Sequence, residues 1–203
     1  MKITVVIASH GDSSWRKLAW DRAYPSAEKS GADEVLIDHQ RNHTRAEVRN
    51  ALTEDAAGDY IVTLDADDEL APGYCDAIRQ MEPVDALVVP RVQFVRGHRE
   101  GHPHFLPRRR IEEDNWMVVG TAFPRDKMLS VGGWRTLTST GTLNEADDWD
   151  LWWRMVNAGM GITYCEGAVY RAHVDRPSVH RSSGRNQRQK WADEIRQLNG
   201  VVQ

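Results

Sequence analysis

The chain has 203 residues, with 26 lysines and arginines against 30 aspartates and glutamates, and a formal net charge of -4 at pH 7. Hydrophobic residues make up 40% and charged residues 28%, which is typical of one soluble globular domain. No stretch approaches the roughly 18 apolar residues of a membrane span. The two cysteines, Cys75 and Cys165, lack the spacing of a CxxC pair or a zinc ribbon. We therefore expect a cytoplasmic protein that folds without disulfides or structural zinc.

Three short apolar runs in the first third of the chain, at 3–8, 34–37 and 60–64, predict strands buried on both faces of a mainly parallel sheet. The segments between them predict helices, one from about residue 12 or 13 to 29 and one over 44–57. Strands that alternate with helices predict right-handed crossovers and a layered α/β fold.

The middle of the chain predicts a helix over 71–81, with a proline at its first position. Apolar runs at 86–90 and 92–95 predict two strands, and 116–123 predicts a returning strand. The arginine- and histidine-rich stretch 96–114 has little periodicity, which is typical of a long functional loop.

Two helices are predicted near the C-terminal end. Residues 147–158 carry tryptophans and a valine at helical spacing, and the polar segment 185–198 predicts a loosely docked terminal helix. We expect a main domain over 1–180 and a polar helical tail over 181–203.

An acidic block, Leu64-Asp-Ala-Asp-Asp-Glu69, directly follows a predicted buried strand. Ligands of open α/β sheets bind at the carboxyl ends of the strands. The Asp-x-Asp spacing places Asp65 and Asp67 on the same side of the chain, where their oxygens suit Mg²⁺ or Mn²⁺ shared with a substrate's phosphates. A solvated acidic turn that caps the next helix is the alternative. Because the chain has no glycine-rich phosphate loop, phosphates would be bound by a metal ion or by arginines.

A second acidic block opens the tryptophan-rich helix. Carboxylates in a first turn are favourable to the helix macrodipole, so this block has a purely structural interpretation. A carboxylate beside apolar aromatics also suits a general base, and Asp148 is the candidate. His173 ends a third segment, Tyr170-Arg-Ala-His173, and a lone histidine is more often structural than a ligand.

Seven segments occur in a distinctive order along the chain. They are the strand Ile3 to Ser9, Asp38 at the end of the second strand, Val48-Arg-Asn50, Gly58-Asp-Tyr-Ile-Val-Thr-Leu-Asp-Ala-Asp-Asp68, Val131-Gly-Gly-Trp134, Asp147-Asp-Trp-Asp-Leu-Trp-Trp-Arg154 and Tyr170-Arg-Ala-His173. In this order they resemble the family 2 glycosyltransferases of the GT-A fold, from about residue 2 to residue 180.

The resemblance implies the GT-A fold, an α/β three-layer sandwich with a mainly parallel central sheet. It also implies transfer of a sugar, with inversion, from a nucleotide diphosphate sugar to an acceptor hydroxyl, with a UDP-sugar favoured over a GDP-sugar. A divalent cation, Mn²⁺ or Mg²⁺, would assist the reaction.

The resemblance also assigns roles to residues. Those that would bind the nucleotide are Ser9, Asp38, Arg49 and Asp65, and those that would bind the metal are Asp65, Asp67 and His173. Asp148 would be the catalytic base. The residues that would contact the donor or acceptor sugar are Trp134, Asp147 and Arg171.

The chain departs from the family pattern in three places and leaves two other functions open. The segment between Asp38 and Arg49 is shorter than is common in the family. Asp147 replaces the usual glutamate before the base, and Ala8-Ser-His-Gly11 replaces the usual Pro-Thr-Tyr-Asn. The acceptor would be bound by the 96–114 and 135–146 loops and the tail. Clustered arginines at 91–110 and 171–196 make modified DNA a possible acceptor. A non-catalytic nucleotide-sugar or nucleic-acid binding module is the third hypothesis.

Overall fold

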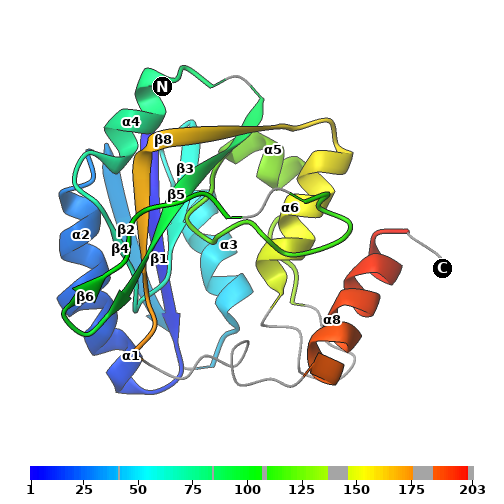
Figure 1. The fold of residues 1–203 in the computed structure, drawn as a ribbon, viewed down its shortest axis with the longest axis horizontal. Coiled ribbons are helices and arrows are strands. Elements are labelled where there is room, and N and C mark those ends of the chain that lie inside the picture. The colour runs from blue at the N-terminus through cyan, green and yellow to red at the C-terminus, as the bar shows by residue number, and fades with distance from the viewer. Residues whose placement is uncertain (41, 84, 107–108, 137–145, 176–184, 201–203) are drawn as a thin grey trace.

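The computed structural model describes the chain except for residues 41, 84, 107–108, 137–145, 176–184 and 201–203 (Figure 1). Its centre is a mixed sheet with the strand order β2-β1-β3-β7-β5-β8-β4, and β6 pairs with β5 at the side. The strands are β1 (Ile3–His10), β2 (Glu34–Gln40), β3 (Tyr60–Leu64), β4 (Glu69–Leu70), β5 (Ala86–Arg96), β6 (Arg99–Glu100), β7 (Ala122–Pro124) and β8 (Gly161–His173).

Parallel pairing dominates the long ladders of this sheet. β1 pairs in parallel with both β2 and β3, and β5 pairs in parallel with β8. The short strands β4, β6 and β7 pair antiparallel with their neighbours. The expected α/β fold with a mostly parallel central sheet is confirmed.

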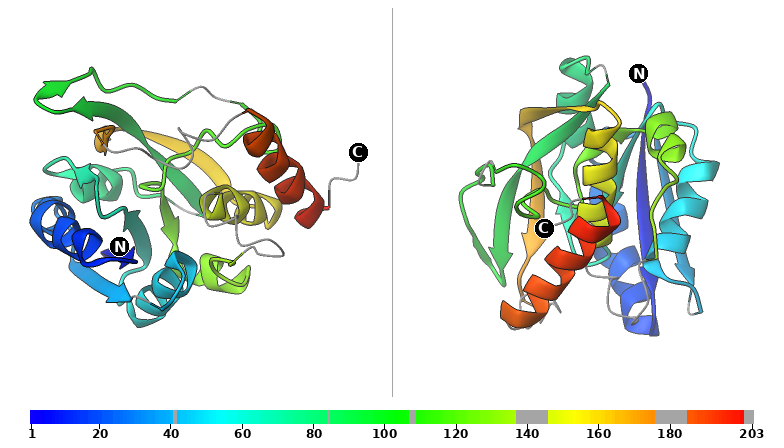
Figure 2. Two further views of the ribbon diagram at one scale, coloured as in Figure 1. Left: turned by 90° about the horizontal axis from the view of Figure 1, so that it is seen from below. Right: turned by 90° about the vertical axis from the view of Figure 1, so that its right-hand side faces the viewer.

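Helices cover both faces of the sheet, as Figure 2 shows from two further directions. They are α1 (Ser13–Leu18), the π-helical η1 (Ala19–Ala23), α2 (Tyr24–Glu28), α3 (Arg45–Asp55), α4 (Tyr74–Gln80), α5 (Arg125–Ser130), α6 (Asp147–Asn157) and α8 (Arg185–Leu198). Successive residues of one strand point to opposite faces, so Val5 belongs to the hydrophobic cluster that contains side chains of η1, α2 and α4, while Val6 belongs to the cluster that contains side chains of α3, α5, α6 and α8. These two hydrophobic clusters make a three-layer sandwich.

The first two crossover helices form as the sequence predicts, with one difference. Thr44 and Glu47 form a reciprocal capping box at the start of α3. The predicted single helix over 12–29 is divided by η1, and Pro25, which has no N–H to donate to an earlier carbonyl, lies just after this π-helical turn. The guanidinium of Arg22 in η1 reaches the acidic loop after β3.

Four details of the predicted elements are wrong. The helix predicted over 71–81 begins at Tyr74, because Gly73 precedes it with a left-handed φ of 75° and the Ala71 amide bonds to β8. The strands predicted over 86–90 and 92–95 are one strand, β5, with a bulge at Pro90/Arg91. Only residues 122 and 123 of the predicted strand 116–123 lie in a strand, β7, and no strand was predicted over β8.

The terminal helix is present and packs closely against α6 (Figure 2). Trp191 is 4% exposed and Ile195 is fully buried in the cluster that contains the tryptophans of α6. Burial of two large apolar side chains contributes a few kcal/mol of stability, so this helix is not loosely docked. Residues 181–184 and 201–203 of the predicted tail lie outside the described residues.

Candidate functional site

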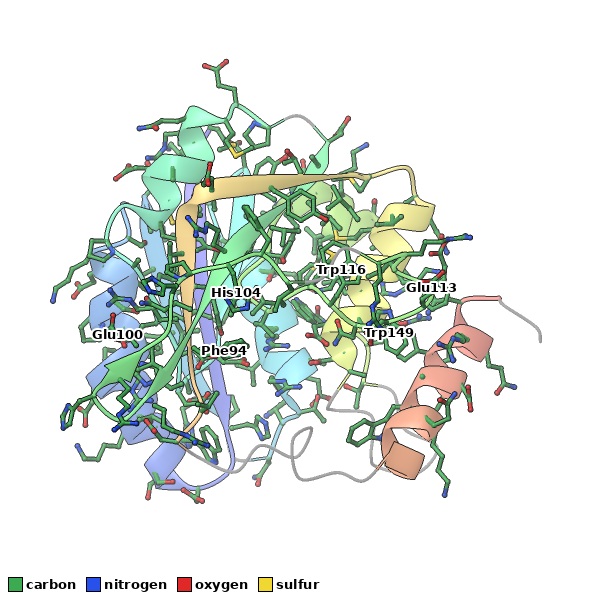
Figure 3. All side chains as sticks on the ribbon, in the orientation of Figure 1. Phe94, Glu100, His104, Glu113, Trp116 and Trp149 are labelled. Atoms are coloured by element: carbon green, nitrogen blue, oxygen red, sulfur yellow. The ribbon has the colours of Figure 1, made fainter. Side chains whose placement is uncertain are left out.

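A cavity of about 520 Å³ lies where β1 and β3 end, next to the start of α6. Its wall combines acidic, basic and apolar side chains from distant parts of the chain: Ala8, Ser9, His10, Trp15, Arg45, Asp65, Ala66, Asp67, Val92, Phe94, Leu106, Asn115, Met117, Val118, Val119, Asp147, Asp148 and Ala172. Figure 3 labels Phe94 on β5 and His104 on the segment that passes in front of the sheet. The position agrees with the rule that open α/β sheets bind ligands at the carboxyl ends of their strands.

The acidic loop after β3 is fixed from outside the cavity. Arg22 donates a 2.7 Å hydrogen bond to the carbonyl of Asp67. The carboxylate of Asp68 accepts a 2.7 Å hydrogen bond from the Tyr170 hydroxyl and another from the His173 amide. Burial, followed by the charge of Asp67, raises the pKa of Asp68 well above its usual value. Asp68 therefore anchors the loop to β8, and its neighbour Asp67 lines the cavity.

Arg49 joins the two acidic segments of the site. Its side chain is almost completely buried and donates to Asp65 at 2.7 Å and to Asp147 at 2.9 Å. Its guanidinium lies 4.4 Å from the centre of the Trp134 ring. Arg45, one helical turn earlier on α3, donates to the other oxygen of Asp147 at 2.9 Å. The carboxylate of Asp147 is thus held by two guanidinium groups.

The adjacent aspartates Asp147 and Asp148 differ in acidity. Burial favours the neutral form of Asp147, but the charges of Arg45 and Arg49 outweigh burial, so the pKa of Asp147 is lowered. Burial, followed by the charge of Asp147, raises the pKa of Asp148 to about 7. A carboxyl group with that pKa exchanges a proton readily near neutral pH, which suits a general base.

Of the four residues expected in the nucleotide subsite, Ser9 and Asp65 line the cavity, whereas Asp38 and Arg49 do not. Ser9 lines the cavity, and its hydroxyl is 2.9 Å from the Nδ1 atom of His39. Asp38 pairs with Ala8 across β1 and β2. The Asp38 carboxylate accepts hydrogen bonds from the amide of His39 and the side chain of Gln40, and it is outside the cavity wall.

Three other expected site residues are also outside the cavity wall. The Trp134 ring packs edge-on against Phe123 and Trp152 in the core, beneath Arg49. Arg171 donates to Gln93 on β5. The Nε2 atom of His173 is 2.6 Å from Glu69, and its Nδ1 atom is buried without a hydrogen-bond partner in the described part of the chain.

Three polar residues in the cavity were not predicted from the sequence. They are His10, Arg45 and Asn115. Burial, followed by the charges of Arg45 and Arg49, lowers the pKa of His10, so its imidazole is neutral at pH 7. Arg45 has the i,i+4 spacing to Arg49 that was available in the sequence. Asn115 has no local signal, because only the fold brings it to α6.

A scan against protein families decides the assignment. The model for glycosyl transferase family 2 matches residues 27–130, just over half of the chain. The chain belongs to this family. Its match contains β2, α3, β3 and the acidic loop that lines the cavity. A search of curated proteins found no match.

Solved structures of TarS from S. aureus share the fold. One TarS structure matches with a TM-score of 0.60 and 12% identity, over 86% of this chain and 37% of that one. TarS 1-349 in complex with UDP matches with a TM-score of 0.61 and 14% identity, over 86% of this chain and 61% of that one. TarS 1-349 in complex with UDP-GlcNAc matches with a TM-score of 0.60 and 12% identity, over 99% of this chain and 66% of that one.

The chain covers only part of the length of these neighbours. It spans between 37% and 66% of the lengths of the TarS chains above. The similarity shows a GT-A type fold. Within the described residues, no helix has the length and apolarity needed to cross a membrane.

Proposed function

We propose that this glycosyltransferase moves a sugar from a UDP-sugar to an acceptor hydroxyl with inversion at the anomeric carbon, and that Asp148 is its base. The observation that carries the proposal is the Asp148 carboxyl, which lines the cavity with its pKa raised to about 7. Asp65 and Asp67 line the same cavity. The TarS complexes with UDP and UDP-GlcNAc support a UDP-sugar as the donor.

The proposed reaction needs one proton acceptor. As the acceptor oxygen bonds to the anomeric carbon, the bond from that carbon to the diphosphate breaks on the opposite face, and the configuration inverts. Asp148 takes the hydroxyl proton during this attack. Asp147 is already paired with Arg45 and Arg49, so its lowered pKa makes it a poor proton acceptor.

A divalent cation fits the carboxylates at the other acidic segment. Asp65 and Asp67 offer hard oxygen ligands of the kind that Mg²⁺ and Mn²⁺ prefer. The described residues hold no group of three or more His, Cys, Asp or Glu that could bind a metal, so the remaining ligands would be phosphate oxygens of the donor. When bound, such an ion neutralises charge on the departing diphosphate. The role of His173 as a further ligand remains a prediction.

Several arginines near the cavity form hydrogen bonds within the protein, and this weakens the hypothesis that the acceptor is DNA. Arg91 donates to the Pro103 carbonyl, Arg171 to Gln93 and Arg196 to two loop carbonyls. These groups stabilise the fold around the cavity. Exposed arginines include Arg99 on the β5–β6 hairpin, and Arg109 and Arg110, which pair with the nearby carboxylates of Asp114 and Glu112. We therefore favour a sugar-bearing or other small hydroxyl acceptor over DNA.

A donor-hydrolysis screen tests the proposed function. Purified protein is incubated with a panel of UDP-sugars and GDP-sugars in Mn²⁺, Mg²⁺ or EDTA, and the released nucleotide is measured. We expect slow, metal-stimulated release of UDP from one donor. The variant Asp67→Ala should lose the metal-stimulated part, and Asp21→Ala, which changes an exposed aspartate on η1, is the matched control. No hydrolysis of any donor, together with no thermal shift by UDP, would contradict the proposal.

A further inference from the structure

The segment that crosses the cavity is fastened to the first turn of α6 at two places. The indole N–H of Trp149 donates a 2.6 Å hydrogen bond to the carbonyl of Ile111. Four residues later, the side-chain amide of Asn115 donates a 3.1 Å hydrogen bond to Oδ1 of Asp148. Figure 3 shows Trp149, Glu113 and Trp116 close together where this segment passes α6. Asn115 therefore reaches Asp148 from an anchored segment.

Both donors to the Asp148 carboxylate bind the same oxygen. Oδ1 accepts from Asn115 at 3.1 Å and from the amide of Trp149 at 2.8 Å. No described residue donates to Oδ2. Two hydrogen bonds on one oxygen restrict rotation of the carboxylate, and the second oxygen is left to accept a proton from a ligand in the cavity.

The amide of Asn115 makes this contact at a cost. Its Oδ1 atom is buried and has no hydrogen-bond partner in the described part of the chain. Buried polar atoms without a hydrogen-bond partner are rare in native proteins, and a role in function is one reason why such an atom is retained. An apolar side chain of similar size would fill the space without that cost, so the amide is explained by its donor bond to Asp148.

We propose that Asn115 is a positioning residue that holds the Asp148 carboxylate through Oδ1 and leaves Oδ2 free to receive the proton of the acceptor hydroxyl. This inference rests on the proposed function, because it takes Asp148 as the base. The Asn115 amide also favours the charged form of Asp148, because its hydrogen bond is stronger to a carboxylate than to a neutral carboxyl group. It counters part of the effect of the neighbouring Asp147.

The test uses Asn115→Leu, which keeps the approximate volume and removes the donor. The chain offers a matched control: Asn199, just after α8, donates a 3.2 Å hydrogen bond to Asp150 on α6, whose side chain is buried outside the cavity wall. The Asp148 carboxyl is titrated by ¹³C NMR in wild type, Asn115→Leu and Asn199→Leu, with Asp148→Asn to assign the signal. Asn115→Ala repeats the measurement if the leucine variant does not fold.

We expect the titration midpoint of Asp148 to rise by about one pH unit in Asn115→Leu, because a hydrogen bond to a charged group is lost. The Asn199→Leu midpoint should match wild type. In kinetics with the donor from the screen, Asn115→Leu should lower kcat about tenfold or more with donor KM within about twofold, and should move the acidic limb of the pH profile upward.

The outcomes separate the inference from the proposed function. If wild type turns over a donor and Asn115→Leu keeps both its Asp148 midpoint and its pH profile, the inference is overturned and the function stands. If Asn199→Leu shifts the midpoint equally, the effect is structural and the inference is also overturned. If wild type turns over no donor, the proposed function fails, and the inference fails with it.

Discussion

Asp65 and Asp147 lie in different acidic segments, and at the scale of single residues they are connected through Arg49. The motif order identified both segments, and Asp65, Asp67, Asp147 and Asp148 all lie in the cavity wall. The sequence did not show that Arg49 would be enclosed by ion pairs, because the pairing partner of a buried arginine depends on contacts 98 residues apart. Asn115 was missed for the same reason.

Arg49→Met should destabilise the fold strongly. It leaves Asp147 with one guanidinium partner in place of two and removes a stacked cation from Trp134. Removal of one partner from a buried ion pair costs about 3–5 kcal/mol, and we expect a loss near the lower end because Asp65 is partly exposed. Urea unfolding measures the change. Arg79→Met, which breaks partly exposed pairs, should cost about 1 kcal/mol or less, and equal losses in both variants would contradict the assignment.

Asp148→Asn should stabilise the protein at high pH. The folded-state pKa of Asp148 is raised from 3.8 to about 7, so between these values the folded protein holds a proton that the unfolded chain releases. The free energy of unfolding of the wild-type protein therefore falls as pH rises through this window. Asp148→Asn avoids this loss, so its free energy of unfolding should exceed that of wild type by on the order of 2 kcal/mol at pH 8. At pH 4 the difference should be near zero. Urea unfolding at both pH values tests this, and a gain independent of pH would contradict it.

At the scale of elements, local patterns predicted the strands that carry a continuous apolar run and the helix that carries its own cap. β1 and β3 are buried almost throughout, β2 contains an apolar run at 35–37 although the strand is only half-buried, and α3 carries its own capping box. β8 was missed because its pattern is interrupted by Glu166 and Gly167 beside a register shift in its partner, and its pairing depends on β5, some 75 residues earlier. The contact between α8 and the cavity segment was likewise invisible in the sequence.

Arg196→Ala should loosen the segment that carries Asn115. Arg196 on α8 donates to the carbonyls of Glu112 and Glu113 at 3.2 and 3.0 Å, and its guanidinium lies 6.0 Å from the Trp149 ring centre. Loss of these bonds should speed amide exchange in the segment by about tenfold, since each bond contributes about 1 kcal/mol. Hydrogen-exchange mass spectrometry measures the rate. Unchanged exchange would show that α8 does not hold this segment.

At the scale of the whole molecule, some charged side chains form a buried network of ion pairs and others lie on the exposed surface. The net charge of -4 combines acidic residues at the cavity with arginines that are bonded to carboxylates and carbonyls around it. The hydrophobic clusters on the two faces of the sheet hold the strand ends in place. The molecule thus gives the two acidic segments different environments, one suited to a cation and one to a proton.

The central claim is that Asp148 acts in turnover and not in donor binding. The most direct measurement compares kcat and the Kd for UDP in wild type and Asp148→Asn, with the donor found by hydrolysis screening. We expect kcat to fall by about 10²-fold or more in Asp148→Asn, because a general base is lost, while the Kd for UDP stays within about twofold. Turnover by Asp148→Asn at the wild-type rate would contradict it.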